Sequence, residues 1–178
     1  MKRLTMCEGS NELTLVNILL ENNALIFTED DLLGLSAYHA RQITTNAQVR
    51  LALNMYFGND VHIMRIGDKQ TDRPIIPPDF RKKISAVEKY CTLPEPEILL
   101  IISEGLVKEY EKVKSKIKPK EFAKSHIRCG KIRYDNSSQF YKDYFGGNCN
   151  KLINTIREYK RIRGFHKKDE LYLADILR

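Results

Sequence analysis

Two short apolar runs, separated by an amphipathic segment, open the chain. Residues 4–7 (Leu-Thr-Met-Cys) have the pattern of a buried strand that ends in a polar turn. Apolar residues then recur at three- and four-residue steps over 12–22, which predicts a helix capped by Ser10 or Asn11. Residues 24–27 (Ala-Leu-Ile-Phe) predict a second strand. Strand, helix and strand in this order are typical of a βαβ unit, so we expect a parallel sheet.

Further strand and helix patterns follow up to about the middle of the chain. A helix is expected over 46–56, and the alternating, β-branched residues 61–66 predict a third strand. The three prolines within 72–78 exclude a helix there, so this segment is expected to be extended. Pro78 can then open a helix that runs to about Cys91.

The second half of the chain has mostly helical patterns. Residues 97–116 fit either a strand followed by a helix or one long helix, and the spacing of Leu106, Tyr110 and Val113 favours the long helix. Four shorter helices are expected at 119–126, 137–145, 148–162 and 169–177. We therefore predict an α/β fold with a small parallel sheet flanked by helices over 1–92. A helical, basic extension over 93–178 is expected to pack on it, giving one compact domain.

Composition places the chain among globular proteins of one domain. It has 178 residues, of which 42% are hydrophobic and 30% charged, and this balance supplies enough apolar side chains for a core. No apolar run approaches the roughly 18 residues of a membrane span, and the first residues do not form a signal peptide. The four cysteines have no metal-binding spacing, which argues against a zinc site. We expect a cytoplasmic protein with no membrane partner.

Positive charge is concentrated in the second half of the chain. Residues 1–90 carry 11 basic and 11 acidic residues, whereas 91–178 carry 19 and 12, which accounts for the net charge of +7. A basic half beside a neutral half indicates a polyanionic partner such as nucleic acid or an acidic protein. A solvated basic surface without a partner is the alternative.

Acidic residues follow two of the expected strands. Glu8 comes directly after the first strand and Asp68 after the third, while Asp72 lies in the same loop and Glu12 begins the first helix. In open parallel sheets, ligands bind beyond the carboxyl ends of the strands. Carboxylates that meet there can hold Mg²⁺ and support attack on a phosphodiester. Each acid also has a structural alternative, such as Glu12 favouring its helix N-terminus.

Three segments resemble the Toprim family. In residues 4–12 (LTMCEGSNE), an apolar strand delivers a glutamate into a glycine-containing turn, with a second acid four residues later. Residues 63–72 (IMRIGDKQTD) stand where Toprim proteins carry an aspartate motif, and 94–100 (PEPEILL) is similar to a third feature of small Toprim nucleases. Toprim proteins usually have two aspartates one residue apart, whereas this chain has Asp68 and Asp72.

The resemblance implies an activity, a cofactor and partners. It implies Mg²⁺ or Mn²⁺ held by Glu8 and Asp68, with Asp72 or Glu97 completing the shell and Glu12 close by. The family glutamate serves in acid–base chemistry, and water is the expected nucleophile in phosphodiester cleavage. OLD-family nucleases and the small partners of ABC-type ATPases, from prokaryotic anti-phage defence, belong to the same group.

Two other functions remain open on the sequence alone. The unusual aspartate spacing also fits a non-catalytic Toprim-like module that binds nucleic acid or a partner ABC-type ATPase. A basic effector that acts on RNA or nucleotides is the third possibility, because metal–carboxylate chemistry does not fix the substrate. We take the nuclease, or a nuclease subunit, as the leading hypothesis, with DNA ahead of RNA as substrate. The sequence does not give the oligomeric state.

Candidate nucleic-acid contacts lie mainly in the basic half. The segment from Lys112 to Arg133 holds nine basic residues and one acid, Glu121. Such a segment can bind phosphates and release their counterions. The candidate contacts are Lys69, Lys114, Lys116, Lys118, Lys120, Arg157 and Arg161. Phe140, Tyr144 and Phe145 stand at helical spacing and are expected to pack in the core rather than stack on bases.

Overall fold

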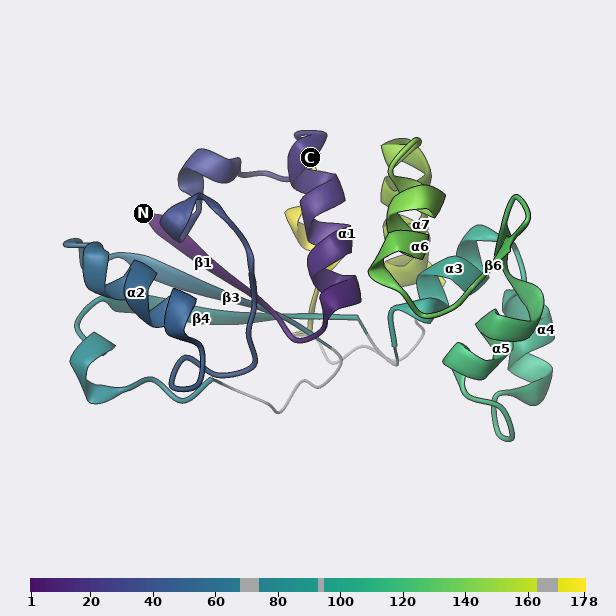
Figure 1. The fold of residues 1–178 in the computed structure, drawn as a ribbon, viewed down its shortest axis with the longest axis horizontal. Coiled ribbons are helices and arrows are strands. Elements are labelled where there is room, and N and C mark those ends of the chain that lie inside the picture. Colours follow the sequence, from purple (N-terminus) through teal and green to yellow (C-terminus); the bar gives the residue numbers. More distant parts are fainter. Residues whose placement is uncertain (68–73, 93–94, 163–169) are drawn as a thin grey trace.

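A five-stranded parallel sheet with the strand order β2-β1-β3-β4-β7 forms the centre of the fold (Figure 1). The computed structural model describes residues 1–67, 74–92, 95–162 and 170–178. The strands are β1 (Lys2–Cys7), β2 (Tyr38–His39), β3 (Val61–Gly67), β4 (Ile84–Cys91) and β7 (Leu171–Tyr172). The expected fold class, a parallel α/β sheet flanked by helices, is confirmed.

Side chains that alternate along the strands pack against different helices on the two faces of the sheet. On β1, Leu4 and Met6 point into a core with α2 (Ala47–Met55), whereas Cys7 joins a second core with α1 (Ser10–Glu21). Successive side chains of a strand point to opposite faces, so the sequence of β1 alone separates the two layers. Burying each aliphatic side chain stabilises the fold by about 1.5–3 kcal/mol, which holds both helices against the sheet.

The strand order reverses between β1 and β3. From β1 the chain passes through α1 to β2 on one side, then crosses to β3 on the other side of β1 and continues outward to β4. β1 and β3 are paired in parallel from Lys2 opposite Val61 to Cys7 opposite Ile66. Their carboxyl ends therefore meet at the point where ligands bind in open α/β sheets.

In the described residues, five helices and a small hairpin follow β4. The helices are α3 (Glu97–Ser103), α4 (Val107–Val113), α5 (Pro119–His126), α6 (Ser138–Phe145) and α7 (Cys149–Ile162). The antiparallel hairpin consists of β5 (Arg128–Cys129) and β6 (Ile132–Arg133). Short 3₁₀ turns are η1 (Glu29–Asp31), η2 (Leu33–Leu35), η3 (Pro78–Phe80) and η4 (Leu173–Ile176). Figure 1 shows α4, α5 and β6 at the end of the molecule away from α2.

One apolar core connects the sheet to these later helices. Cys7 and Ile66 of the sheet belong to the same buried cluster as Leu100 of α3, Phe140 of α6 and Ile156 of α7. β7, from the C-terminal segment, joins the sheet beside β4. Among the described residues, no helix is both long and apolar enough to cross a membrane.

Several elements agree with the sequence predictions. These are the strands expected at 4–7 and 61–66 and the helices expected at 12–22, 46–56, 119–126, 137–145 and 148–162. Phe140, Tyr144 and Phe145 are buried, as expected of core residues. Part of the extended segment expected at 72–78 lies outside the described residues; residues 74–77 have no helix.

The strand predicted at 24–27 is wrong. Leu25 forms an isolated antiparallel bridge with Leu177, and the backbone N–H of Ile26 donates to the carbonyl of Ile176. The segment thus pairs with the last residues of the chain, outside the sheet. The position beside β1 is taken by β2 instead.

The helix predicted from Pro78 to Cys91 is also wrong. Only one 3₁₀ turn, η3, follows the prolines, and residues 84–91 form β4. The apolar spacing of this segment fits a helix, but its backbone pairs with β3 along nearly its whole length. Sheet pairing therefore overrides the local pattern.

Two predictions about the later helices need correction. The long helix expected at 97–116 is two helices, α3 and α4, because the chain turns at Gly105 with a φ of 71°. The helix expected at 169–177 is the strand β7 followed by the 3₁₀ turn η4. The hairpin of β5 and β6 was not predicted; Gly130, with a φ of 58°, forms its turn.

Replacement of Gly105 by Ala should destabilise the protein by about 1 kcal/mol, because an L residue is strained in the left-handed region. A Cβ at Gly105 would meet no atom within 4 Å, so backbone strain is the only expected cost. Gly147→Ala is the matched control, since a Cβ there also meets nothing and its φ is not positive. Thermal unfolding should show a loss of roughly 2–4 °C for Gly105→Ala alone. Equal effects of both changes would contradict the argument.

Candidate functional site

Glu8 lies at the carboxyl end of β1, against the end of β3. Its backbone N–H donates to the carbonyl of Ile66 at 2.8 Å, so the ladder between the strands extends one residue beyond β1. The residue is only 9% exposed. A Cβ added at Gly67 would collide with the Glu8 carboxylate. Glycine at the end of β3 therefore leaves the space that the Glu8 side chain fills.

Arg41 approaches Glu8 from the other side of β1. The backbone N–H of Ala40 donates to the carbonyl of Cys7 at 2.9 Å, which extends the pairing of β2 with β1. The next residue, Arg41, places its Nε 3.9 Å from Oε1 of Glu8. The side chain of Arg41 is 72% exposed, whereas that of Glu8 is 11% exposed. The ion pair thus joins an inner carboxylate to an outer guanidinium.

Arg65 fixes the backbone that carries Arg41. It lies within β3, opposite Met6 of β1, and its side chain is fully buried. Its Nη1 donates to the carbonyl of Ala40 at 2.9 Å and also to the carbonyl of Arg41. A charged donor makes strong hydrogen bonds in a buried environment, so the turn after β2 is held firmly.

Glu12 points back toward the end of the sheet from the first turn of α1. It is 6% exposed, and a Cβ added at Gly9 would collide with its carboxylate. Burial, and next the negative charge of Glu12, raise the pKa of the Cys7 thiol. Glu12 therefore lies close to the last residue of β1. Its position in the first turn of α1 also agrees with the alternative that it favours the helix N-terminus.

Glu97 is held in the interior by a tyrosine. It lies in the first turn of α3, is 3% exposed, and accepts a hydrogen bond of 2.6 Å from the Tyr134 hydroxyl. Burial and this hydrogen bond raise the pKa of Tyr134, so the hydroxyl stays protonated as the donor. In the amide orientation that pairs donors with acceptors, Asn136 also donates to Glu97 at 3.1 Å and accepts from Nζ of Lys120 at 2.9 Å.

Tyr141 connects the surroundings of Glu12 and Glu97. It lies on α6, and its hydroxyl is 3.3 Å from the hydroxyl of Tyr134. Burial, then the charge of Glu97 and more weakly that of Glu12, raise the pKa of Tyr141 well above its usual range. Glu12 of α1 and Glu97 of α3 therefore approach the same buried hydroxyl from two elements.

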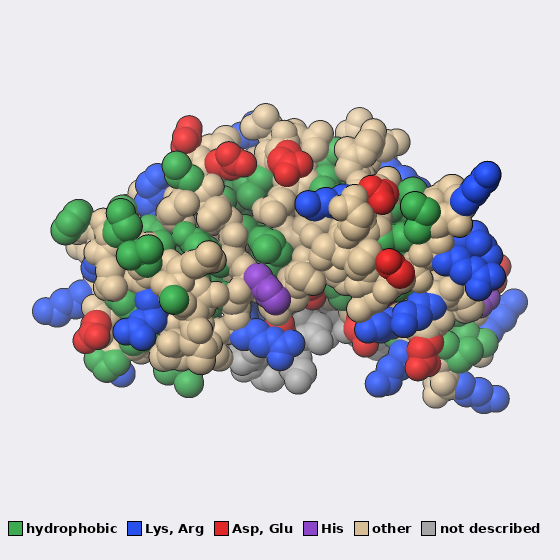
Figure 2. Space-filling view, viewed as in Figure 1, with side chains coloured by type: hydrophobic (Ala, Val, Ile, Leu, Met, Phe, Trp, Pro, Cys, Tyr) green, Lys and Arg blue, Asp and Glu red, His purple; other side chains and the backbone are tan. Residues whose placement is uncertain are grey.

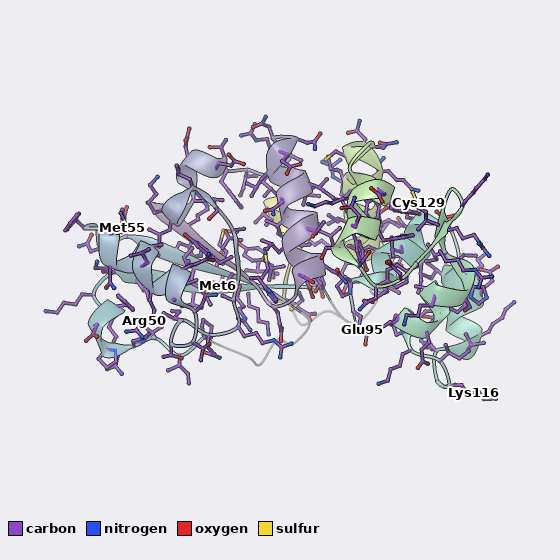
Figure 3. The ribbon with its side chains drawn as sticks, in the orientation of Figure 1. Met6, Arg50, Met55, Glu95, Lys116 and Cys129 are labelled. Atoms are coloured by element: carbon purple, nitrogen blue, oxygen red, sulfur yellow. The ribbon has the colours of Figure 1, made fainter. Side chains whose placement is uncertain are left out.

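Glu95 (Figure 3) is close to charges of both signs, which are those of Glu97, Lys118 and Lys120. Burial, and next the charge of Glu97, raise the pKa of Glu95, while Lys118 and Lys120 act in the opposite direction. The backbone N–H of Lys120 also lowers the pKa of Glu95. The start of α5 is thus directly beside the carboxylates of the segment that leads into α3.

The structure brings only some of the predicted metal ligands together. Glu8, Glu12 and Glu97 are all buried on the side of the sheet where the strands end. In the part of the chain that the structure describes, no three His, Cys, Asp or Glu side chains form a group able to hold a metal ion. Asp68, Lys69 and Asp72 lie outside the described residues, so the sharing of an ion by Glu8 and these aspartates stays a prediction.

The predicted nucleic-acid contacts fall into two groups. We call residues 107–133, which form α4, α5 and the β5–β6 hairpin, the basic lobe; Figure 2 shows Lys and Arg side chains gathered over these elements. Within it, Lys114, Lys116 and Lys118 are exposed, although Lys114 also pairs with Glu111 at 2.5 Å, and Lys116 is at the outer tip of the lobe (Figure 3). The other group, on α7, is engaged within the chain: Arg161 pairs with Glu158 at 2.6 Å, and Arg157 donates to the carbonyl of Arg178.

The residues of the site that were not predicted from the sequence are Arg41, Arg65 and Tyr134. Arg65 had a visible signal, because it is a charged residue inside an otherwise apolar strand. A charge in such a place is buried only with partners, which here are the carbonyls after β2. Arg41 and Tyr134 had no such signal, since their roles depend on contacts between residues far apart in the chain.

Comparisons with known proteins do not assign the chain to a family: no protein-family model, no curated protein and no solved structure matches it.

Replacement of Arg65 by Met should lower the free energy of unfolding by about 1–3 kcal/mol, because the buried carbonyls of Ala40 and Arg41 would lose their charged donor. Urea unfolding followed by circular dichroism measures this change. Arg50→Met, at an exposed position of α2, is the control and should have little effect. An Arg65→Met protein as stable as the control would show that these hydrogen bonds do not hold the turn.

Proposed function

We propose that this chain is a Toprim-like, metal-dependent nuclease or nuclease subunit that cleaves phosphodiester bonds in nucleic acid, with DNA ahead of RNA as the substrate. The observation that carries the proposal is the position of Glu8. It lies buried at the carboxyl end of β1, beside the end of β3, where the strand order reverses. In doubly wound sheets this is where substrates and cofactors bind.

The burial of several carboxylates near this point supports a cationic ligand. Glu8, Glu12 and Glu97 are 9%, 6% and 3% exposed, respectively. Removing a carboxylate from water costs free energy unless hydrogen bonds or a cation compensate for it. A buried acid at a ligand-binding position is typical of functional sites. Glu97 accepts a hydrogen bond from Tyr134, and Glu8 pairs with Arg41.

The donor set at the end of β1 and β3 suits Mg²⁺ or Mn²⁺. Mg²⁺ takes oxygen ligands and is usually bound through one or two carboxylates while keeping several waters. Glu8 would supply the first carboxylate, and Asp68, which follows Gly67 in the sequence, the second, with Asp72 as a further candidate. When bound, the ion would supply Lewis-acid stabilisation of the charge that develops on the phosphodiester.

The residues of the chain itself fit hydrolysis by water better than a covalent tyrosine route. Tyr134 and Tyr141 are the tyrosines near the acids, and both are buried with their hydroxyls in hydrogen bonds. Their raised pKa values oppose formation of a phenolate nucleophile. Glu8 is placed to hold or accept a proton at the end of β1, which is the acid–base role implied by the Toprim resemblance.

The basic lobe offers a surface for the nucleic-acid backbone next to these acids. Lys118 and Lys120 face Glu95, and Nζ of Lys120 bonds to the side chain of Asn136. Asn136 in turn contacts Glu97. A polyanion bound along the lobe would therefore lead to the end of the sheet where the carboxylates lie. An anti-phage role, an ABC-type ATPase partner and a cytoplasmic location complete the proposal and rest on the sequence analysis.

Mn²⁺ or Mg²⁺ should raise the melting temperature of the protein, and Glu8→Gln should abolish most of this rise because it removes a charged ligand. Differential scanning fluorimetry measures the shift, and plasmid DNA, single-stranded DNA and RNA incubated with Mn²⁺ report cleavage. Glu21→Gln, at the exposed end of α1, is the matched control and should keep both responses. Chelation with EDTA should remove both.

Two results would separate this proposal from its alternatives. A metal response without cleavage of any substrate would favour the non-catalytic binding module. Cleavage of RNA but not DNA would favour the effector that acts on RNA. A full response to Mn²⁺ in Glu8→Gln would show that the ion, if bound, does not use the end of β1.

Binding of DNA should weaken steeply with salt if the basic lobe contacts phosphates. For duplex DNA, the logarithm of the binding affinity falls linearly with the logarithm of the salt concentration, and each phosphate contact adds about 0.9 to the steepness of this slope. The variant Lys114→Ala, Lys116→Ala, Lys118→Ala should therefore lower the slope by up to about 3 in fluorescence anisotropy. Arg157→Ala, Arg161→Ala is the comparison, since these side chains lie on α7, outside the basic lobe. An unchanged slope in the triple variant would exclude the lobe from the interface.

A further inference from the structure

Arg41 is an exposed cation held beside the buried acid of the candidate site. Its guanidinium lies 3.9 Å from the Glu8 carboxylate, which is close enough for electrostatic attraction but too far for a hydrogen bond. Most of the side chain faces solvent, with 72% exposed. The guanidinium thus has donors available for another partner while it stays at the end of β1.

Stability does not explain this arrangement. An ion pair with one largely exposed member contributes about 0–1 kcal/mol to folding. The fold nevertheless uses a fully buried arginine, Arg65, to fix the backbone carbonyls of Ala40 and Arg41. A buried charge is a costly way to place a side chain that adds little stability. The contacts of Arg65 fix the backbone from which the Arg41 side chain approaches Glu8.

A phosphate group fits the position and chemistry of Arg41. The planar guanidinium donates two parallel hydrogen bonds to phosphate oxygens, which a lysine cannot do in the same geometry. β2 and the following turn place it on one side of Glu8, and β3 ends on the other side at Gly67. A phosphodiester that approaches the carboxylate end of β1 would pass within reach of the Arg41 side chain.

We infer that Arg41 binds the phosphodiester at this site and that its guanidinium changes partner between two anions. Without ligands it pairs with Glu8, and when a divalent cation neutralises the Glu8 carboxylate, Arg41 turns to a non-bridging phosphate oxygen of the nucleic acid. This inference rests on the proposed function and adds the residue that contacts the substrate. Arg65 is the positioning residue, because it donates to the backbone carbonyls of the turn that carries Arg41.

The exchange predicts opposite effects on metal and nucleic acid when Arg41 is replaced by Ala. Loss of a competing cation beside Glu8 should strengthen Mn²⁺ binding by about two- to fivefold, the range expected for an exposed ion pair. Loss of a charge-assisted hydrogen bond should weaken DNA binding by about tenfold. Arg41→Lys keeps the positive charge but loses the paired donors of the planar guanidinium. It should therefore leave the Mn²⁺ affinity nearly unchanged and still weaken DNA binding.

The test measures Mn²⁺ affinity by calorimetry without DNA, and DNA affinity by fluorescence anisotropy with Ca²⁺ in place of Mn²⁺ to limit cleavage. Arg50→Ala, which removes an exposed charge on α2, is the matched control (Figure 3). Thermal unfolding confirms that each variant is folded, which is expected because Arg41 and Arg50 are both exposed.

Opposite shifts for Arg41→Ala, absent from the control, are the expected result. Weaker binding of both Mn²⁺ and DNA, or values equal to those of Arg50→Ala, would overturn the exchange while leaving the metal site intact. A wild-type protein that does not bind Mn²⁺ would overturn the proposed function and this inference together.

Discussion

Parallel pairing of β1 with β3 in one fixed register is the constraint on which the site depends. The register places Cys7 opposite Ile66, so Glu8 and Gly67 follow side by side. A shift by one residue would turn every side chain of the strand to the other face, which would take Leu4 and Met6 out of the core that they form with α2. The free energy of core packing therefore also fixes where the Glu8 carboxylate lies.

A second constraint is that charged side chains buried inside the fold need hydrogen-bond partners. Arg65 is fully buried and donates to the carbonyls of Ala40 and Arg41, while Glu97 accepts hydrogen bonds from Tyr134 and Asn136. Both charges therefore have partners chosen by the tertiary structure, one on each side of the sheet's end. Glu8 differs, because its cationic neighbour Arg41 is mostly in solvent. The acid with the more exchangeable partner is the one at the reversal of strand order.

The sequence predicted those parts of the fold in which local pattern and tertiary structure agree. The alternation over 61–66 and the helical spacing over 12–22 each had one reading, and both elements are present. The segment 84–91 fits a helix or a strand, and pairing with β3 decides it, which no local pattern contains. The position of Glu8 at a strand end was predictable from its neighbours in the chain. Its contact with Arg41 was not, because the two residues meet only through the pairing of β2 with β1.

The closing segment of the chain has a consequence for how the molecule assembles. β7 completes the sheet beside Tyr90 and Cys91, and the residues after it pair with Ala24 and Ile26 near the other end of the chain. Until those late residues are made, the outer edge of β4 has no strand beside Tyr90 and Cys91 and presents unpaired backbone groups there. An open edge of this kind can pair with another chain, so synthesis passes through an interval of exposure to aggregation. The same contacts of high sequence separation make slow closure of the fold the expected behaviour.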